Sequence, residues 1–131
     1  MFERLKLLEN NIRDLIDLKS KFSLEDVCTD KTKEWALRYG LLETIQIIID
    51  ISCYLVSKYN LGNPATYAEC VELLQRFKYL DQGLAEKLHG MVGLRNILVH
   101  EYLAIEREKL YRLLEDIGDF KEFAIRIQRF L

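Results

Sequence analysis

Apolar residues recur at helical spacing along most of the chain. In the first segment they stand three or four positions apart with charged residues between them, at Leu5, Leu8, Ile12 and Leu15. This spacing is typical of an amphipathic helix that packs one side against other helices. We therefore expect a helix over residues 2–19.

Polar capping residues predict where the next helix begins. Ser23 with Asp26 resembles a capping box on a short turn, and Asp30 can cap a long second helix that runs to about Lys58. Around residues 45–49 this helix is apolar on most sides, which indicates a central, buried position.

Turn and capping residues also divide the second half of the chain. The segment 60–64 contains a glycine and the only proline, and it should end the second helix because proline cannot continue one. Thr66 and Glu69 form another capping-box pattern, which opens a third helix through about Phe77. The remaining predicted helices are a fourth over residues 82–102, capped by Asp81, and a fifth over residues 106–127.

No segment alternates between apolar and polar residues for long enough to predict a strand. We therefore expect an all-α protein, an antiparallel bundle of four to five helices with short loops. The chain has 131 residues, of which 50% are hydrophobic, with one proline and six glycines. These values exclude intrinsic disorder and predict a single domain over residues 1–131.

The formal charge is −2, from 19 Lys and Arg against 21 Asp and Glu. This balance disfavours a nonspecific nucleic-acid coat protein, which neutralises many phosphates, so any RNA contact must be local. The N-terminal residues lack an apolar signal core, and the longest apolar run, over residues 45–56, contains Asp50 and is shorter than the ~20 residues of a membrane helix. We therefore expect a cytoplasmic protein without a membrane contact.

The three cysteines, Cys28, Cys53 and Cys70, form no CxxC pair and are odd in number. Their number and spacing argue against a disulfide framework or a zinc knuckle. We expect them to be small core residues in a reducing compartment.

A charged residue interrupts the apolar seam of the predicted fourth helix. The seam positions are Leu84, Leu88, Met91, Arg95, Leu98 and Tyr102. Because a guanidinium keeps its charge and a buried unpaired charge is unfavourable, Arg95 must meet a carboxylate, a second subunit or an anionic ligand. Glu43 and Asp50, which share one face of the second helix, either supply that carboxylate or are ordinary polar positions.

A second stripe on the same helix contains His89, Gly93, Asn96 and His100. It has two interpretations. In one it is a solvent face, with Arg95 reaching water and His100 complementing the negative end of the helix. In the other it belongs to a phosphate site, because arginine is a permanent forked cation and histidine moves protons near neutral pH.

Helix geometry restricts how these side chains can meet. At about 100° per residue, Arg95 and Tyr102 point within ~20° of each other, whereas Arg95 and His100 diverge by ~140°. Either the helix distorts near His100, or the complete site is assembled across a two-fold axis from two copies of the helix. Gly93 leaves space for such an approach.

Residues 95–102, with the sequence RNILVHEY, match the RxxxxHxY signature of HepT-like toxins, small all-α ribonucleases of the HEPN superfamily. Residues 41–51 also resemble the second helix of that family, and the resemblance extends over essentially all 131 residues. It implies an endoribonuclease that needs no metal or cofactor and acts as a homodimer or a higher oligomer. In that role His100 is the general base or acid, Arg95 holds the phosphate, and Asn96 orients the imidazole or binds the substrate.

The resemblance also implies regulation of Tyr102. HepT-like toxins are paired with a minimal nucleotidyltransferase antitoxin, MntA, in type VII toxin–antitoxin systems, and MntA transfers AMP to the tyrosine of the HxY motif. On chemistry alone, a second interpretation of Tyr102 stays open, that of an aromatic residue that packs in the seam at the interface. Two alternatives to an RNase toxin stay open: a non-catalytic, substrate-binding partner of a nucleotidyltransferase, and a dimeric helical scaffold.

Overall fold

The computed structural model describes residues 1–131 and contains helices and no strand. The α-helices are α1 (Phe2–Lys21), α2 (Leu24–Thr29), α3 (Lys31–Lys58), α4 (Tyr67–Arg76), α5 (Gln82–His100), α6 (Arg107–Arg112) and α7 (Ile117–Ile127). Short 3₁₀ turns follow α5, α6 and α7, at Tyr102–Ala104, Leu113–Asp116 and Gln128–Phe130. The predicted all-α class is confirmed.

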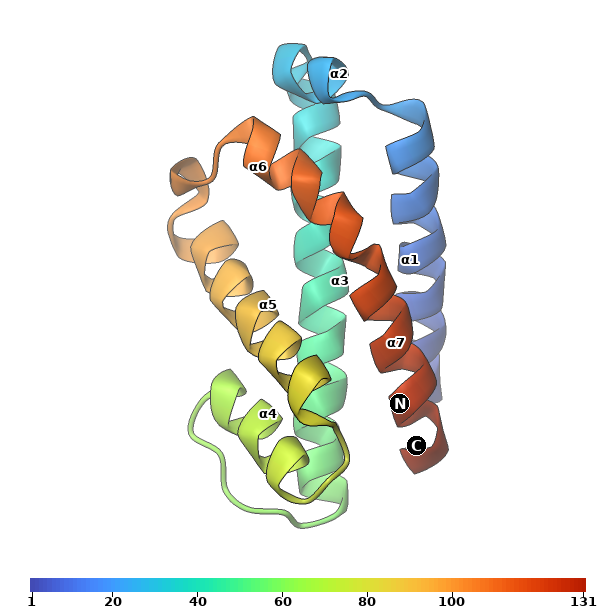
Figure 1. Cartoon of the computed structure of the whole chain (residues 1–131), viewed down its shortest axis with the longest axis vertical. Coiled ribbons are helices and arrows are strands. Elements are labelled where there is room, and N and C mark those ends of the chain that lie inside the picture. Colours follow the sequence, from blue (N-terminus) through green and yellow to red (C-terminus); the bar gives the residue numbers. More distant parts are fainter.

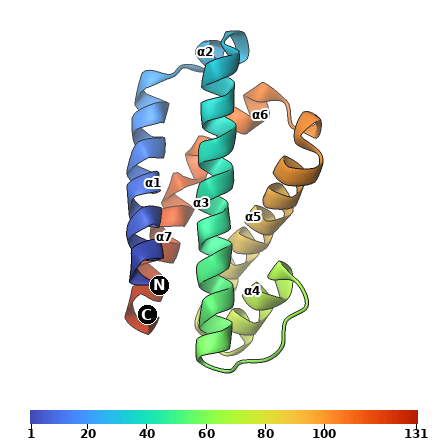
Figure 2. The same cartoon turned by 180° about the vertical axis from the view of Figure 1, so that it is seen from behind.

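The long helix α3 lies at the centre of the bundle (Figures 1 and 2). It packs against α1, α4 and α5, and α1 also packs against α7. In Figure 1, α4 lies near the C-terminal end of α3, where α5 begins, and the α6–α7 segment runs diagonally across the bundle. Both chain termini lie at the same end of the molecule. This arrangement places α5 between α4 on one flank and α6–α7 on the other.

The predicted caps set the starts of four helices. At α4 the hydroxyl of Thr66 accepts a hydrogen bond from the amide of Glu69 at 3.2 Å. Ser23 and Asp26 form the reciprocal capping box of α2. Asp30 accepts hydrogen bonds from two backbone amides of α3, and Asp81 accepts one from the amide of Leu84 at the start of α5. These contacts satisfy amides that have no partner within the helix, so the boundaries follow from local sequence.

The apolar centre of α3 is buried in the core, as predicted. Its buried hydroxyls, Thr44 and Ser52, donate to the carbonyls of Gly40 and Ile48 one turn earlier, which keeps both polar groups satisfied. By length and composition α3 is also the one helix that could cross a membrane, but 56% of its most apolar window is buried inside the bundle. The core position accounts for that composition.

The last two predicted helices differ from the structure. The fourth was predicted to reach Tyr102 but ends at His100, since Glu101 leaves the helical conformation with φ −136° and ψ 45°. The fifth was predicted to be continuous over residues 106–127 but is divided into α6 and α7 by the 3₁₀ turn Leu113–Asp116. Apolar spacing continues through both breaks, so periodicity alone could not reveal them.

The cysteine prediction was wrong for two of the three residues. Cys53 of α3 and Cys70 of α4 form a disulfide with a Cα–Cα distance of 5.2 Å, and Cys28 is free. The two cysteines are 17 positions apart, and the segment between them includes the loop that folds α4 back against α3. Helix packing, which sequence spacing does not report, brings the two side chains together.

Candidate active site

The motif residues lie at the end of α5 and just beyond it. Arg95, Asn96 and His100 belong to α5, and Tyr102 begins the 3₁₀ turn that follows. Arg95 is half-buried, whereas Asn96 and His100 are exposed and Tyr102 is 59% exposed. The candidate chemistry is therefore open to an incoming ligand.

Arg95 is held by side chains from three helices. Its Nε donates to Oε1 of Gln46 on α3 at 2.8 Å, and one terminal nitrogen donates to Oδ1 of Asn96 at 3.2 Å. Its guanidinium carbon lies 5.2 Å from the centre of the Tyr67 ring at the start of α4, a cation–π contact. All three partners are uncharged, so the positive charge of Arg95 is positioned but not neutralised.

Neither candidate carboxylate pairs with Arg95. The Asp50 carboxylate accepts from Nε2 of Gln46 at 2.9 Å and forms an ion pair with Arg4 at 2.5 Å. Gln46 thus bridges Asp50 and Arg95 without bringing the two charges into contact.

Glu43 is also engaged elsewhere. Its Oε1 accepts from Nδ2 of Asn11 at 2.7 Å, and its carboxylate beside Tyr39 raises the pKa of that phenol through a hydrogen bond and charge repulsion. The sequence offered three alternative partners for the charge of Arg95, and the structure excludes the first, a carboxylate within the chain. A second subunit or an anionic ligand remains.

The end of α5 at His100 changes the predicted directions of the motif side chains. Arg95 and His100 both lie within α5, so their directions differ by about 140° around the helix axis. The prediction that Tyr102 shares a helix face with Arg95 was wrong, because α5 ends two residues before Tyr102. The phenol instead projects from the 3₁₀ turn at the surface.

Arg38 on α3 holds the segment that carries Tyr102. Its two terminal nitrogens donate to the backbone carbonyls of Tyr102 at 2.9 Å and Ile105 at 3.0 Å. Its Nε donates to Glu34 at 3.0 Å. The forked guanidinium thus donates to two backbone carbonyls of the turn. In a continuing helix these carbonyls would accept from backbone amides, so Arg38 replaces those hydrogen bonds.

Glu34 binds the arginine that holds this turn. It is only 8% exposed and makes ion pairs with both Arg38 and Arg107. Arg107, at the start of α6, also donates to the carbonyl of Cys28 at 2.6 Å. One buried carboxylate therefore links α3, α2 and the two ends of the segment between α5 and α6.

Exposed apolar side chains surround this turn. We call them the aromatic patch: Trp35, Tyr39, Val99, Tyr102 and Leu103. A recess of about 290 Å³ beside them is lined by residues of α3 and by Leu98 of α5. A surface of this kind is typical of a contact with another protein.

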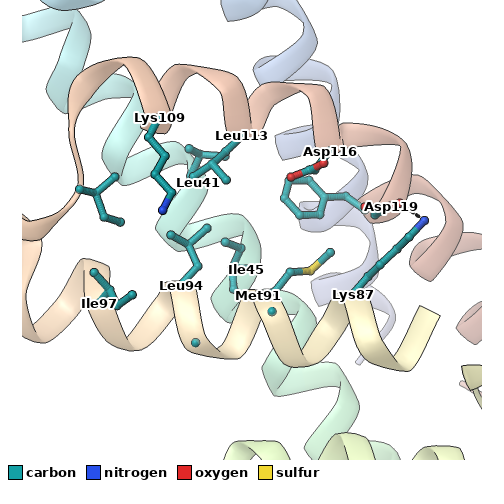
Figure 3. Close-up of a pocket in the computed structure, with 14 residues that line it drawn as sticks. Leu41, Ile45, Lys87, Met91, Leu94, Ile97, Lys109, Leu113, Asp116 and Asp119 are labelled. Carbon is teal, nitrogen blue, oxygen red and sulfur yellow. Dashed lines mark hydrogen bonds and ion pairs between the residues drawn. The ribbon is translucent and has the colours of Figure 1, made fainter. Parts of the chain in front are cut away.

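A larger cavity of about 580 Å³ lies on the other flank of α5 (Figure 3). Its walls are mostly apolar and come from α3, α5 and the α6–α7 segment. Figure 3 shows Lys87 at one end, directed toward Asp119, and the two groups form an ion pair at 2.8 Å. None of the motif residues lines this cavity.

No group of three or more His, Cys, Asp or Glu side chains is placed to hold a metal ion. The groups gathered around Arg95 are amides and an aromatic ring. Their chemistry favours an anion and an aromatic ligand.

Sequence reasoning missed four residues of this region: Glu34, Arg38, Gln46 and Tyr67. Glu34 and Arg38 stand four apart, a spacing common to many surface ion pairs. Gln46 lies among isoleucines, and Tyr67 lies inside a capping pattern. The polar break at Gln46 in an otherwise apolar stretch was the one usable signal.

Comparisons with known proteins cover nearly the whole chain. The sequence model of a family described as Ribonuclease HepT-like matches residues 8–127. The mRNA nuclease HepT of Shewanella oneidensis is 26% identical over 120 residues, which cover 91% of this chain and 84% of the relative. A putative RNase of Archaeoglobus fulgidus is 23% identical over 112 residues, which cover 86% of this chain and 84% of the relative.

One solved structure contains a tri-AMPylated HEPN toxin of Shewanella oneidensis in complex with an MNT antitoxin. It matches this chain with a TM-score of 0.87 at 23% identity, over 98% of this chain and 96% of the compared chain. At this level of identity the likeness establishes a shared fold.

Proposed function

The chain belongs to the Ribonuclease HepT-like family and has the HEPN toxin fold, and we propose that it is an endoribonuclease toxin whose site contains Arg95 and His100. The observation that carries this proposal is the charge of Arg95. The guanidinium is half-buried and fixed by Gln46 and Asn96, yet no carboxylate of the chain neutralises it. An RNA phosphate is the anion that the family's activity supplies.

The roles of the side chains follow from their chemistry. His100 takes the proton of the RNA 2′-hydroxyl, the 2′-oxygen attacks the adjacent phosphorus, and the bond to the 5′-oxygen breaks as that oxygen takes up a proton. Arg95 holds the phosphate and stabilises the charge that develops on it. Asn96 supports Arg95 through its Oδ1. The expected products are a 2′,3′-cyclic phosphate and a 5′-hydroxyl, and no step uses a metal.

The divergence of Arg95 and His100 on one helix supports a homodimer. Two copies of α5 facing each other across a two-fold axis would combine Arg95 of one copy with His100 of the other. A Cβ added at Gly93 would meet nothing within 4 Å, so no contact inside the chain requires glycine there. Close approach of a second helix gives a reason for it.

Replacement of Gly93 tests this dimer. Gly93→Ala should lower the dimer fraction measured by light scattering at micromolar concentration. Gly118→Ala is the control, because its added Cβ also meets nothing within 4 Å but lies on α7. A wild-type protein that is only monomeric would contradict the assembly.

We further propose that an MntA-like nucleotidyltransferase silences the toxin by AMPylation of Tyr102. The phenol is 59% exposed on a turn whose backbone Arg38 holds, so a modifying enzyme can reach it. The surrounding aromatic patch offers a protein-binding surface. Such a cytoplasmic pair would be a type VII toxin–antitoxin system.

The deciding experiment uses purified, unmodified protein and RNA, with and without EDTA. Cleavage that continues in EDTA and leaves 2′,3′-cyclic phosphate ends is expected. Loss of cleavage in EDTA would contradict the mechanism. Absence of cleavage in both conditions would instead favour the non-catalytic partner of a nucleotidyltransferase.

A further inference from the structure

A second cavity adjoins Arg95 on the α4 flank of α5. Its volume is about 650 Å³, and its lining includes Cys53, Tyr67, Ala68, Cys70, Val92 and Asn96. The disulfide between Cys53 and Cys70 joins two of its walls, α3 and α4. The cavity is therefore bounded by elements that are covalently and sterically fixed.

The cavity and the cation of Arg95 share two residues. Tyr67 lines the cavity, and its ring also lies beneath the Arg95 guanidinium. Asn96 lines the cavity, and its Oδ1 accepts from Arg95, which leaves its Nδ2 group as a donor for a ligand. An anion bound at Arg95 would thus stand at the edge of a space with an aromatic wall and an amide.

We propose that this cavity binds the nucleobase of the RNA nucleotide next to the phosphate held by Arg95. This inference rests on the proposed function and assigns a base-binding subsite to the same site. An unpaired base can stack on an aromatic ring, and its edge can hydrogen-bond to an amide. Tyr67 supplies the ring and Asn96 the amide, while the apolar side chains of Ala68 and Val92 accept the flat base.

We expect stacking on Tyr67 to determine how tightly a base binds, and the amide of Asn96 to determine which base is preferred. Every base has a π face, so Tyr67 should strengthen the binding of all four nucleotides. Asn96 can donate through Nδ2, so bases that present an acceptor on the edge that faces it should bind better than the others. Tyr67 and Asn96 should therefore determine where in a sequence the RNA is cut.

The experiment measures binding of the four nucleoside 3′-monophosphates and of inorganic phosphate by NMR titration or calorimetry. In Tyr67→Ala, nucleotide affinity should fall at least about fivefold, while phosphate affinity changes less than about twofold. Tyr67→Phe keeps the ring and should retain nucleotide affinity. Tyr54→Ala is the matched control, because Tyr54 is similarly exposed, 36% against 38%, and lines neither this cavity nor the one in Figure 3.

A second variant tests the space rather than the ring. Ala68→Leu places extra carbon atoms at the cavity wall, so it should weaken nucleotide binding and leave phosphate binding unchanged. Equal loss of nucleotide and phosphate binding in Tyr67→Ala would overturn the inference, because Tyr67 would then only position Arg95. Unchanged nucleotide affinity in both variants would overturn it as well.

Cleavage assays separate this inference from the proposed function. If wild type cleaves RNA and Tyr67→Ala cuts at the same positions with the same efficiency, the subsite is wrong and the RNase assignment stands. If wild type cleaves no RNA, the RNase assignment fails, and the nucleotide titrations still decide whether the cavity binds a base.

Discussion

The two flanks of α5 each carry a cavity, and their charges differ. On the α6–α7 flank Lys87 pairs with Asp119 on the facing helix, and the walls are mostly apolar (Figure 3). A second lysine, Lys109, also lines this cavity, but it is exposed and no partner holds it in place. On the α4 flank Arg95 has only neutral partners, and the adjoining cavity has an aromatic and an amide wall.

The two cavities have similar volumes, about 580 and 650 Å³, so their charges distinguish them better than their sizes. A paired charge has already gained its Coulomb energy, so it offers little to a ligand. A positioned but unneutralised cation gains most when an anion arrives. The α4 flank therefore suits the phosphate of the proposed function better than the α6–α7 flank does.

Removal of the motif side chains should have the largest effect. Arg95→Ala and His100→Ala should each lower RNA cleavage by about 10²- to 10⁴-fold, because in the proposed mechanism Arg95 stabilises the phosphate and His100 transfers the proton. Lys109→Ala removes an exposed cation from the α6–α7 cavity and should leave cleavage near wild type. Initial rates on one RNA, with helix content checked by circular dichroism, provide the measurement. Wild-type rates for His100→Ala would exclude its assigned role.

Modification of Tyr102 should have the second-largest effect on RNA cleavage. AMP adds negative charge and bulk beside the motif, so the adduct should repel RNA and lower the cleavage rate at least tenfold. A tenfold change corresponds to about 1.4 kcal/mol of free energy. Intact-mass measurement after co-expression with an MntA-like enzyme should show AMP adducts on wild type and none on Tyr102→Phe. An adduct that persists in Tyr102→Phe would place the modification elsewhere.

Loss of the Glu34 carboxylate should have a smaller effect, seen mainly in stability. Glu34→Gln leaves Arg38 and Arg107 without their shared anion and should lower the free energy of unfolding by about 1–3 kcal/mol. Cleavage should also fall, because Arg38 holds the turn after His100. Urea denaturation measures the change. Glu25→Gln, an exposed carboxylate in no ion pair, is the control, and equal stability of the two variants would contradict this role.

The smallest effect is expected on the α6–α7 flank, at Asp116. Partial burial raises the pKa of this carboxyl, and the neighbouring acids Asp119 and Glu115 raise it further. The native state thus holds the proton more tightly, so the contribution of Asp116 to stability is present at low pH and is lost as the pH rises through the raised pKa. Asp116→Asn should stabilise the protein at pH 7 by less than about 0.5 kcal/mol.

The pH dependence provides the check on Asp116. The gain from Asp116→Asn should disappear as the pH falls well below 3.8, the ordinary pKa of this carboxyl, because the wild-type group is then protonated in both states. Thermal unfolding at pH 7 and pH 3 measures it. A gain that is the same at both pH values would mean that charge is not its cause.

Much of the fold could be predicted because its signals are local. Capping contacts span two or three residues, as at Asp30 and Asp81, and helical periodicity repeats every three or four. The motif was equally local, because residues 95–102 carry Arg95, Asn96, His100 and Tyr102 together. These features gave the helix starts, the all-α class and the candidate chemistry directly.

The tertiary structure decided what surrounds those residues. Arg95 meets Gln46 from 49 positions away, and Arg38 reaches the carbonyl of Tyr102 across 64 positions. The end of α5 at His100 and the Cys53–Cys70 disulfide likewise depend on which helices lie side by side. The sequence by itself determined that an arginine interrupts an apolar seam. Only the packing of α3, α4 and α5 determined that its neighbours are neutral, because side chains distant in sequence meet according to the assembled helices.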